Sequence, residues 1–433
     1  LRALAVLPVI LFHADFAIFS GGFVGVDVFF VLSGYLITRL IINEIDRQTF
    51  SIADFYERRA RRILPALFFI MACSIPLAWI LLLPSDLVDF SQSLAANPLF
   101  VANFLFWMER GYFGVATELK PLIHTWSLSV EEQFYVLFPL IFVFAWKRTV
   151  FLYTLLTLAL VGSLSASYLI TNLHFDTAFY LLPTRAWELL IGTCAALLLR
   201  KNLPALKNSR VTNDFLSFLG LLLIIIAVLS FNSSTPFPGL YALVPASGTW
   251  LVIVFSERSN YAKTFLGTPV LVFLGLISYS AYLWHQPIFS FYKHSGITLS
   301  GPILYLGLGL LSIFLGFLSW KYVEQPFRNR SYLNQATIFK LSIVCSAIFI
   351  ALGSIGYFMN GFPTRYGAED RKLLTQFIDV TDYTQKRFDS LELKKFSQYE
   401  KPNLLIIGDS FAKDVVNAVY ENGMDAHYDI STV

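Results

Sequence analysis

The sequence has few charged residues and few cysteines. Only 14% of its 433 residues are charged and 56% are hydrophobic, whereas a soluble domain carries about 25% charged residues, so an ordinary soluble protein is excluded. Cys73, Cys194 and Cys345 lie at unrelated spacings in apolar runs, which predicts no disulfide framework and no metal site. The net charge of +3 is too small to indicate a nucleic-acid partner. Because the sequence begins without an initiator methionine or a signal peptide, we expect it to be a fragment.

Apolar stretches long enough to cross a bilayer recur along the chain. They predict a polytopic α-helical membrane protein with eleven transmembrane helices. Residues 86–107 contain two aspartates and two asparagines, so we expect an external or re-entrant segment there rather than a twelfth span. The approximate predicted spans are 3–19, 24–43, 63–83, 133–146, 149–170, 178–199, 215–231, 239–256, 268–291, 302–320 and 337–358.

Positive charge supports the count of eleven. With the N-terminus in the cytoplasm, eleven helices place every basic cluster on the cytoplasmic side, as the positive-inside rule requires. Twelve helices would place the four later clusters outside. The same odd number of helices puts the polar tail after residue 358 outside the cytoplasm. The clusters are 58–62, 147–148, 200–210, 258–263 and 321–330.

The tail ends in a different pattern. A short apolar strand at Leu404–Ile407 is followed by a Gly-Asp-Ser turn and a helix from about Ala412. This order predicts the truncated start of an α/β domain, with Ser410 presented as a nucleophile on the turn.

The first apolar run, "LRALAVLPVILFH", contains Arg2 and His13. Eleven residues at 100° each return to within about 20° of the same direction, so both side chains face one way, about 16 Å apart along the helix. Ionisable groups at bilayer depth usually mark a pathway or a reaction. The alternative is a hydrogen-bonded histidine inside the bundle.

A cluster of four arginines without a lysine, Arg58, Arg59, Arg61 and Arg62, stands just before the third predicted span. Such a cluster is either a topology anchor or a phosphate clamp, since guanidinium groups bind phosphate oxygens bidentately. Four arginines are more than anchoring needs.

Further polar residues lie in or near the predicted spans. Asp27 stands in the glycine-rich run "GGFVGVDVFFVLSGYL", so it is either a buried carboxylate site or part of close helix packing. Arg185 and Glu188, three residues apart, are most simply an internal ion pair. His285 precedes Pro287, where a kink could open a polar pocket.

The segment "KPLIHTWSLSVEEQFYVLFP" is dense in polar and aromatic residues. Ser129 and Glu132 fit a capping box for the following helix, which predicts a structural role for Glu132. Glu131 and His124 have no such role and are the better site candidates.

Together these motifs resemble a known family. "LRALAVLPVILFH", "GVDVFFVLSGYLI", "FYERRARRILP", "HTWSLSVEEQFY", "RAWELLIG" and "SYSAYLWHQPI" resemble, in order, the acyltransferase-3 family of bacterial membrane acyltransferases, and the tail resembles the start of the SGNH-hydrolase-like domain often fused behind that core. The resemblance implies a ten-helix acyltransferase domain at 1–330, an extra linking helix at 331–358, an extracytoplasmic linker at 359–403 and an SGNH-like fragment at 404–433.

The function implied by this resemblance is transfer of an acyl group, usually acetyl, from cytoplasmic acyl-CoA to a hydroxyl of a cell-envelope glycan. The glycan would be lipopolysaccharide O-antigen, peptidoglycan or an exopolysaccharide, and the enzyme a multi-pass protein of the bacterial inner membrane with a periplasmic tail. Acyl-CoA would be a donor substrate, so no bound cofactor is expected.

Site roles follow from the same resemblance. The family's Arg-x10-His motif falls on Arg2 and His13, with His13 as the base, and its Arg-x-x-Arg motif falls on Arg59 and Arg62. We expect Glu131 and Ser410 as further catalytic candidates, and Arg58 beside Arg59 and Arg62 in holding the CoA phosphates. Phe411 follows Ser410 where the family commonly has histidine, and the later Asp-x-x-His block is absent.

Two other functions stay open at this point. A transporter or flippase would use the buried His, Asp and Glu residues as a proton or substrate path, but it does not explain the arginine cluster. A glycosyltransferase that uses a lipid-linked sugar would also need cationic residues. Direct transfer to the glycan and relay through Ser410 are likewise both open.

Overall fold

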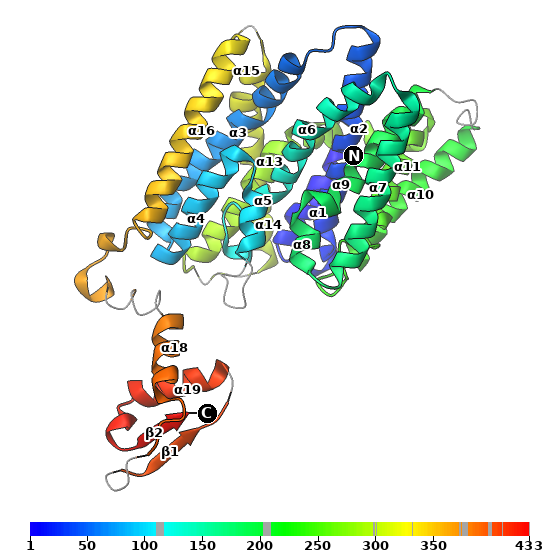
Figure 1. Ribbon diagram of the computed structural model, residues 1–433. Coiled ribbons are helices and arrows are strands. Elements are labelled where there is room, and N and C mark those ends of the chain that lie inside the picture. Colours follow the sequence, from blue (N-terminus) through cyan, green and yellow to red (C-terminus); the bar gives the residue numbers. More distant parts are fainter. Residues whose placement is uncertain are drawn as a thin grey trace. The chain divides into compact units, whose positions relative to one another are not determined.

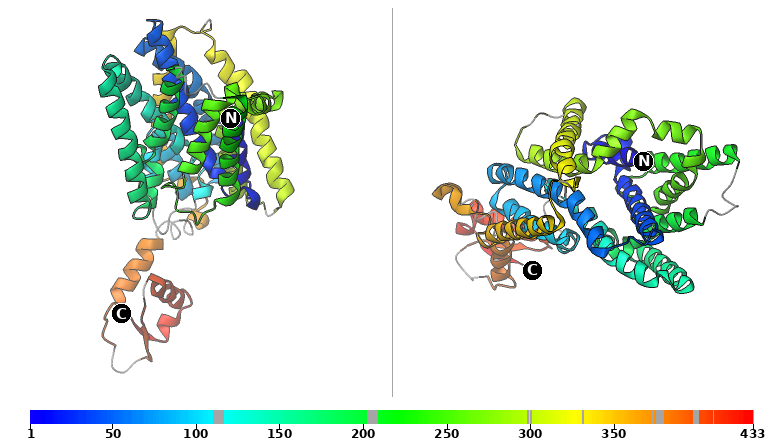
Figure 2. Two further views of the ribbon diagram at one scale, coloured as in Figure 1. Left: turned by 90° about the vertical axis from the view of Figure 1, so that its right-hand side faces the viewer. Right: turned by 90° about the horizontal axis from the view of Figure 1, so that it is seen from above.

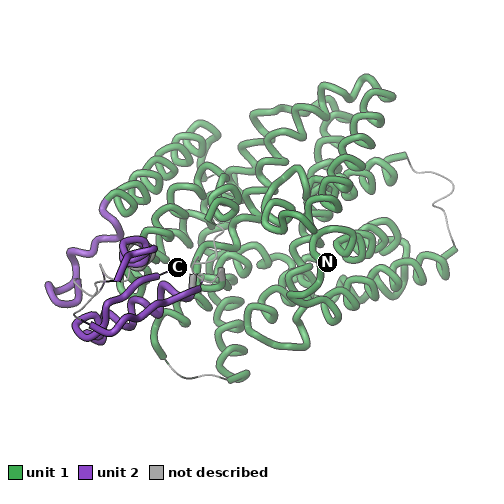
Figure 3. The backbone as a smooth tube through the Cα atoms, turned by 60° about the horizontal axis from the view of Figure 1, so that its bottom comes forward, with its two compact units in different colours: residues 1–358 green, residues 359–433 purple. Residues whose placement is uncertain are grey.

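The computed structural model covers residues 1–433 and describes all of them except 110–116, 202–208, 298, 300, 331, 372–373, 375–379, 397–400, 409 and 433. It divides into two compact units, residues 1–358 and 359–433 (Figure 3). The boundary falls where the last predicted span ends.

The first unit is a bundle of helices that run side by side in two perpendicular views (Figures 1 and 2). Each of the eleven predicted spans overlaps one of its helices, and eight helices in the described part are long and apolar enough to cross a membrane. The predicted class of a polytopic helical membrane protein is confirmed. The helices are α1 Arg2–His13, α2 Gly25–Asp46, α3 Ile52–Leu81, α4 Pro84–Ala96, α5 Ala102–Met108, α6 Thr125–Trp146, α7 Thr149–Thr171, α8 Phe175–Tyr180, α9 Leu182–Arg200, α10 Arg210–Ser230, α11 Leu243–Phe255, α12 Tyr261–Leu266, α13 Pro269–His294, α14 Pro302–Ser319, α15 Gln325–Arg328 and α16 Gln335–Phe358.

The first helix is shorter than predicted. α1 ends at His13 instead of residue 19, and Asp15 behind it has a left-handed φ of 56°. Twelve residues extend about 18 Å, less than the roughly 30 Å of a bilayer's hydrocarbon core. α4 and α5, which replace the doubtful segment 86–107, are likewise too short to span.

The third helix begins eleven residues earlier than predicted. Ser51 caps α3 by accepting a hydrogen bond from the Asp54 backbone N–H at 3.3 Å. The arginine cluster therefore lies inside α3 and not ahead of it, so helical periodicity decides which way each arginine faces.

The sixth helix also begins earlier, at Thr125. Ser129 and Glu132 are consequently inside α6, and the predicted capping box is wrong. The Ser129 hydroxyl instead donates to the Thr125 carbonyl one turn back, at 3.2 Å.

Close packing of α2 against α9 depends on two glycines. A Cβ at Gly34 would lie 1.8 Å from the Leu189 carbonyl oxygen, and one at Gly192 would lie 2.0 Å from that of Val31. Only glycine allows the two backbones to approach this closely. The glycine-rich surroundings of Asp27 thus serve helix packing.

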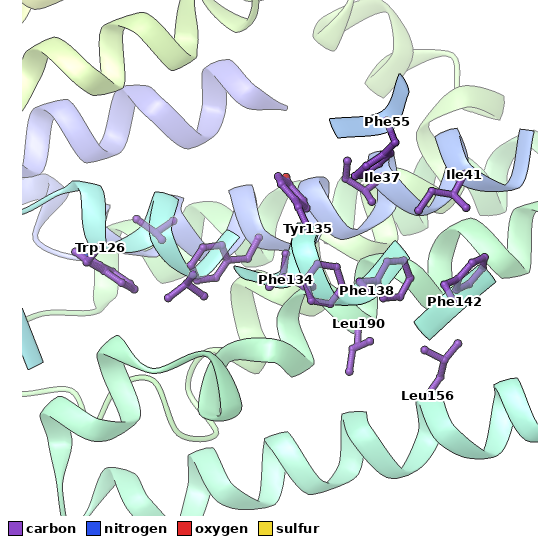
Figure 4. Close-up of a cluster of buried hydrophobic side chains, with 14 of the residues drawn as sticks. Ile37, Ile41, Phe55, Trp126, Phe134, Tyr135, Phe138, Phe142, Leu156 and Leu190 are labelled. Atoms are coloured by element: carbon purple, nitrogen blue, oxygen red, sulfur yellow. The ribbon is translucent and has the colours of Figure 1, made fainter. Parts of the chain in front are cut away.

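Aromatic residues of α6 fill the adjoining core. The rings of Phe134 and Phe138 stack at 4.7 Å, and Phe142 follows at 5.1 Å. Figure 4 shows Leu190 and Leu156 on the same side of α6 as these rings, while Tyr135 points away from Leu190. This core fixes the rotation of α6 and hence the direction in which its polar residues face.

The second unit contains α18 (Val380–Leu391), β1 (Asn403–Ile406), α19 (Ser410–Glu421) and β2 (Asp429–Thr432). β1 and β2 are parallel, with Asn403 opposite Asp429. The predicted strand and helix both appear within two residues of their expected bounds. A parallel strand–helix–strand unit is the α/β beginning that the sequence predicts.

Candidate functional site

Helical periodicity separates the four arginines of α3 into two pairs. Arg58 forms an ion pair with Glu44 at 2.7 Å, and Arg61 forms one with Glu57 at 2.8 Å. Arg59 and Arg62, three residues apart and so on one face, line a cavity instead. The sequence places Arg58 beside them as a ligand-binding residue, but in the structure its charge is already paired outside the lining of that cavity.

We call this cavity, of about 70 Å³, the arginine pocket. Arg2, at the start of α1, lines it with Arg59 and Arg62. Within the described residues, none of these three guanidinium groups forms an ion pair. The other residues that matter here are Val26, Ser33, Glu131, Tyr135, Tyr279 and Tyr282.

Two residues of α6 line the arginine pocket beside its cations. The guanidinium of Arg59 lies 5.3 Å from the ring centroid of Tyr135, a cation–π contact that orients it. Glu131 accepts a hydrogen bond from the Ser33 hydroxyl. Three guanidinium groups thus face one carboxylate, so the pocket has an excess of positive charge.

A second cavity, of about 220 Å³, lies at the other end of α1, and we call it the histidine pocket. Val26 and Tyr282 line both pockets, so the two cavities are neighbours. Tyr282 is held at this boundary, since its hydroxyl donates to the His124 carbonyl at 2.9 Å and lies 2.8 Å from the Ser127 hydroxyl. Its lining also includes Phe12, His13, Glu118, Trp126, Phe179, Arg185 and Phe237.

Three histidines from separate elements meet beside the histidine pocket. The ring of His285, on α13, lies 5.1 Å from that of His13 and 5.3 Å from that of His124. His285 Nδ1 contacts the Tyr282 carbonyl, which favours the tautomer with a proton on Nδ1. His13 and His124 line the cavity, and His285 packs against both.

A short turn, Thr117–Leu119, brings Glu118 into the wall of the histidine pocket. α13 holds this turn, because Gln286 donates to the Glu118 carbonyl at 3.0 Å and Ser290 donates to the Leu119 carbonyl at 2.5 Å. Lys293 pairs with the Glu118 carboxylate. The hydrogen bond from Lys293 lowers the pKa of Glu118 below the ordinary value, so the Glu118 carboxylate stays ionised in the wall.

The sequence-predicted residues thus fall into separate places. Arg2, Arg59, Arg62 and Glu131 meet in the arginine pocket, and His13 and His124 meet in the histidine pocket. Ser410 begins α19 in the second unit, and its side chain lies outside the described part. No group of three or more His, Cys, Asp or Glu side chains suited to a metal is found among the described residues.

Sequence reasoning missed the aromatic residues and the tertiary partners. Tyr282 stands in "SYSAYLWHQPI" without any pattern that marks it as a boundary residue. Arg185 is paired with Glu188, as predicted, but its shorter contact is with Asp27, 158 residues away.

The chain matches the model of an acyltransferase domain over residues 1–321. Among characterised proteins, it is 30% identical over 346 residues to O-acetyltransferase OatA of Staphylococcus aureus strain NCTC 8325; the match covers 77% of this chain and 57% of that protein. A protein of S. aureus strain COL named as a putative O-acetyltransferase is 29% identical over 454 aligned positions, covering 96% of this chain and 73% of the relative. No solved structure matches the chain.

Proposed function

The chain belongs to the acyltransferase family whose domain it matches, and from that premise we propose that it moves an acetyl group from acetyl-CoA to a hydroxyl of a cell-envelope glycan. The observation that carries the proposal is the arginine pocket. Three guanidinium groups without ion pairs in the described part of the chain form a site for a polyanion, and CoA carries several phosphate charges. Arg59 and Arg62 can bind phosphate oxygens bidentately.

The neighbouring histidine pocket is the proposed binding site of the acceptor. With the phosphates at the arginines, the thioester would reach the boundary at Tyr282, and His13 would lie on the far side of it. His13 would take the proton of the acceptor hydroxyl as its oxygen attacks the thioester carbonyl carbon. The carbon–sulfur bond then breaks, and CoA leaves as a thiolate whose sulfur takes the proton from His13. The products are the glycan ester and free CoA.

Glu131 has a different role in this proposal. Its carboxylate lies in the arginine pocket with three cations, not beside His13. We assign it to positioning the arginines, together with Ser33, and not to proton transfer.

The proposed location is the bacterial inner membrane, with the arginine pocket open to the cytoplasm and the histidine pocket to the outside. The basic clusters support this orientation, because eleven predicted helices place all of them on the cytoplasmic side. The second unit, Met359–Val433, would then be extracytoplasmic, which suits a domain that handles the glycan.

Two donors test the proposal directly. Purified protein is incubated with acetyl-CoA or with acetyl-pantetheine, which has the same thioester but no phosphate, and CoA or pantetheine thiol release and ester formation on an added glycoside are measured. At equal low donor concentration, we expect the rate of thiol release and ester formation to be at least about a hundredfold higher with acetyl-CoA than with acetyl-pantetheine. Absence of thiol release with either donor would contradict the proposal and favour a transporter.

A relay through the second unit is tested by Ser410→Ala. If the acetyl group passes through Ser410, glycan modification stops in this variant, because only the serine hydroxyl can carry the ester. CoA release by the membrane domain continues. Unchanged glycan modification would exclude an essential relay and leave the second unit to orient the acceptor.

A further inference from the structure

One buried arginine in the wall of the histidine pocket has no part in the transfer chemistry above. Arg185, on α9, has its Nη2 atom 2.8 Å from Asp27 Oδ1, and its Nε atom lies 3.2 Å from Glu188 Oε1. The side chain is fully buried, and its Nη1 atom has no hydrogen-bond partner within the described residues. A buried donor without an acceptor is costly, so this nitrogen points to a ligand in the pocket that Arg185 lines.

Aromatic rings surround the same guanidinium. Three of these rings also line the histidine pocket, so a ligand beside Arg185 would contact aromatic rings. The negative face of an aromatic ring attracts electropositive hydrogens, such as the C–H groups on one face of a pyranose. The distances from the guanidinium carbon to the ring centroids are 5.3 Å for Phe30, 5.8 Å for Trp126, 5.7 Å for Phe179 and 5.5 Å for Phe237.

The charges around this pocket do not favour an anion. Two carboxylates, Asp27 and Glu188, contact the single guanidinium of Arg185. Glu118, which is paired with Lys293, is a carboxylate in the wall of the pocket itself. Because this guanidinium of Arg185 already faces two carboxylates, its Nη1 donor suits a neutral oxygen acceptor, such as a hydroxyl or an amide carbonyl, better than a third carboxylate.

The size of the pocket limits the ligand further. Its volume of about 220 Å³ is below the roughly 300–1,000 Å³ of pockets for drug-sized ligands. This volume is enough for one sugar ring.

We propose that the histidine pocket binds one uncharged pyranose ring of the acceptor, with Arg185 Nη1 donating to a hydroxyl or acetamido oxygen and Trp126, Phe179 and Phe237 packing against its C–H face. The inference rests on the proposed function, because this ring carries the hydroxyl that His13 deprotonates. The carboxylates around the pocket should weaken the binding of sugars that have a free carboxylate.

Binding of simple glycosides to the full chain tests the inference. Dissociation constants of methyl N-acetyl-β-glucosaminide and methyl β-glucuronide are measured by calorimetry, and that of CoA is measured on the same samples. We expect the neutral glycoside to bind at least tenfold more tightly than the glucuronide. Arg185→Lys keeps the charge near Asp27 but removes the planar fork, and it should weaken the neutral glycoside at least tenfold.

Arg200→Lys is the matched control on the same helix. Arg200 pairs with Asp46 at an exposed position, with 45% of its side chain accessible, so the glycoside should bind within twofold of the unmodified protein. Phe179→Leu is the second test variant, because it removes one ring of the pocket and leaves the ion pairs of Arg185 intact. It should weaken the glycoside severalfold while CoA binds as before.

The outcomes separate this inference from the proposed function. If Arg185→Lys binds CoA normally and the glycoside as tightly as before, or if the glucuronide binds as well as the neutral sugar, the inference is wrong. If Arg185→Lys is misfolded and therefore fails to bind CoA, the Phe179→Leu variant tests the inference instead. Glycoside binding that is unchanged in Phe179→Leu would overturn the inference. An unmodified protein that releases CoA from acetyl-CoA but binds neither glycoside defeats only the inference, whereas one that binds no CoA defeats the proposed function.

Discussion

The arginine pocket and the histidine pocket use the same residue type in opposite ways. Arg59 and Arg62 line the first pocket without ion pairs among the described residues, while Arg185 in the second is held by Asp27 and Glu188. A guanidinium without a carboxylate partner attracts an anionic ligand, and one already matched by carboxylates acts only as a shaped donor. The pairing of an arginine, more than its presence, therefore indicates what a pocket can bind.

The first helix connects the two pockets. Arg2 lies in one and His13 in the other, about 16 Å apart along the helix axis. In the proposed function the donor and the acceptor bind at opposite ends of α1, and the acetyl transfer takes place near Tyr282 between them.

The largest effect is expected from His13→Ala. Removal of a general base typically lowers the rate by about 10²–10⁴-fold, so acetyl transfer to a glycoside should fall by that factor. The measurement is ester formation at saturating acetyl-CoA. CoA binding should stay within about twofold, since His13 is not among the residues of the arginine pocket. A variant with normal turnover would remove His13 from the mechanism.

A smaller effect, on the other pocket, is expected from Arg59→Lys combined with Arg62→Lys. Lysine keeps the charge but loses the bidentate fork, and a hydrogen bond to a charged group contributes about 1.5–3 kcal/mol. CoA should bind at least about tenfold more weakly, while glycoside binding is unchanged. Arg58→Lys is the matched control, because Arg58 is paired with Glu44, and its effect should stay below about threefold. Equal effects of the two substitutions would mean that the whole cluster only anchors the helix.

The smallest effect is expected from Glu118→Gln, which removes a carboxylate from the histidine pocket. Exposed ion pairs contribute about 0.2–1 kcal/mol, so binding of methyl β-glucuronide should improve by no more than about fivefold, with the neutral glycoside unchanged. In the unmodified protein the pKa of Glu118 is lowered by the hydrogen bond from Lys293. Its charge is therefore present above its ordinary pKa and is lost only as the pH falls through the lowered value. A glucuronide affinity that does not respond to the substitution would remove Glu118 from ligand discrimination.

The sequence predicted the helices better than it predicted their ends. Hydropathy located the long helices because crossing a bilayer requires about 20 apolar residues, whereas α1, with twelve residues, is shorter than the predicted span. It missed the starts of α3 and α6, since the polar turns at Ile52–Arg62 and Thr125–Glu132 continue the helix beyond the apolar stretch. Local capping by Ser51 decides one of these starts.

The candidate site divides in the same manner. Arg59, Arg62, Arg2 and His13 could be found from the motifs along the chain. The contact between Asp27 and Arg185 spans 158 residues, and Tyr282 becomes a boundary residue only through the packing of α13 against α1. Such partners follow from the tertiary fold, which no local pattern encodes.

If donor and acceptor meet from opposite sides of the membrane, the protein should carry out vectorial transfer in proteoliposomes. Acetyl-CoA labelled in the acetyl group is enclosed in the lumen, and methyl N-acetyl-β-glucosaminide is added outside. Orientation is read with an impermeant thiol reagent on Ala60→Cys, in a protein whose three native cysteines are replaced by serine. We expect labelled ester on the outside glycoside and free CoA in the lumen, only from molecules whose residue 60 faces the lumen. Labelled ester that forms only when both substrates are on one side would contradict it.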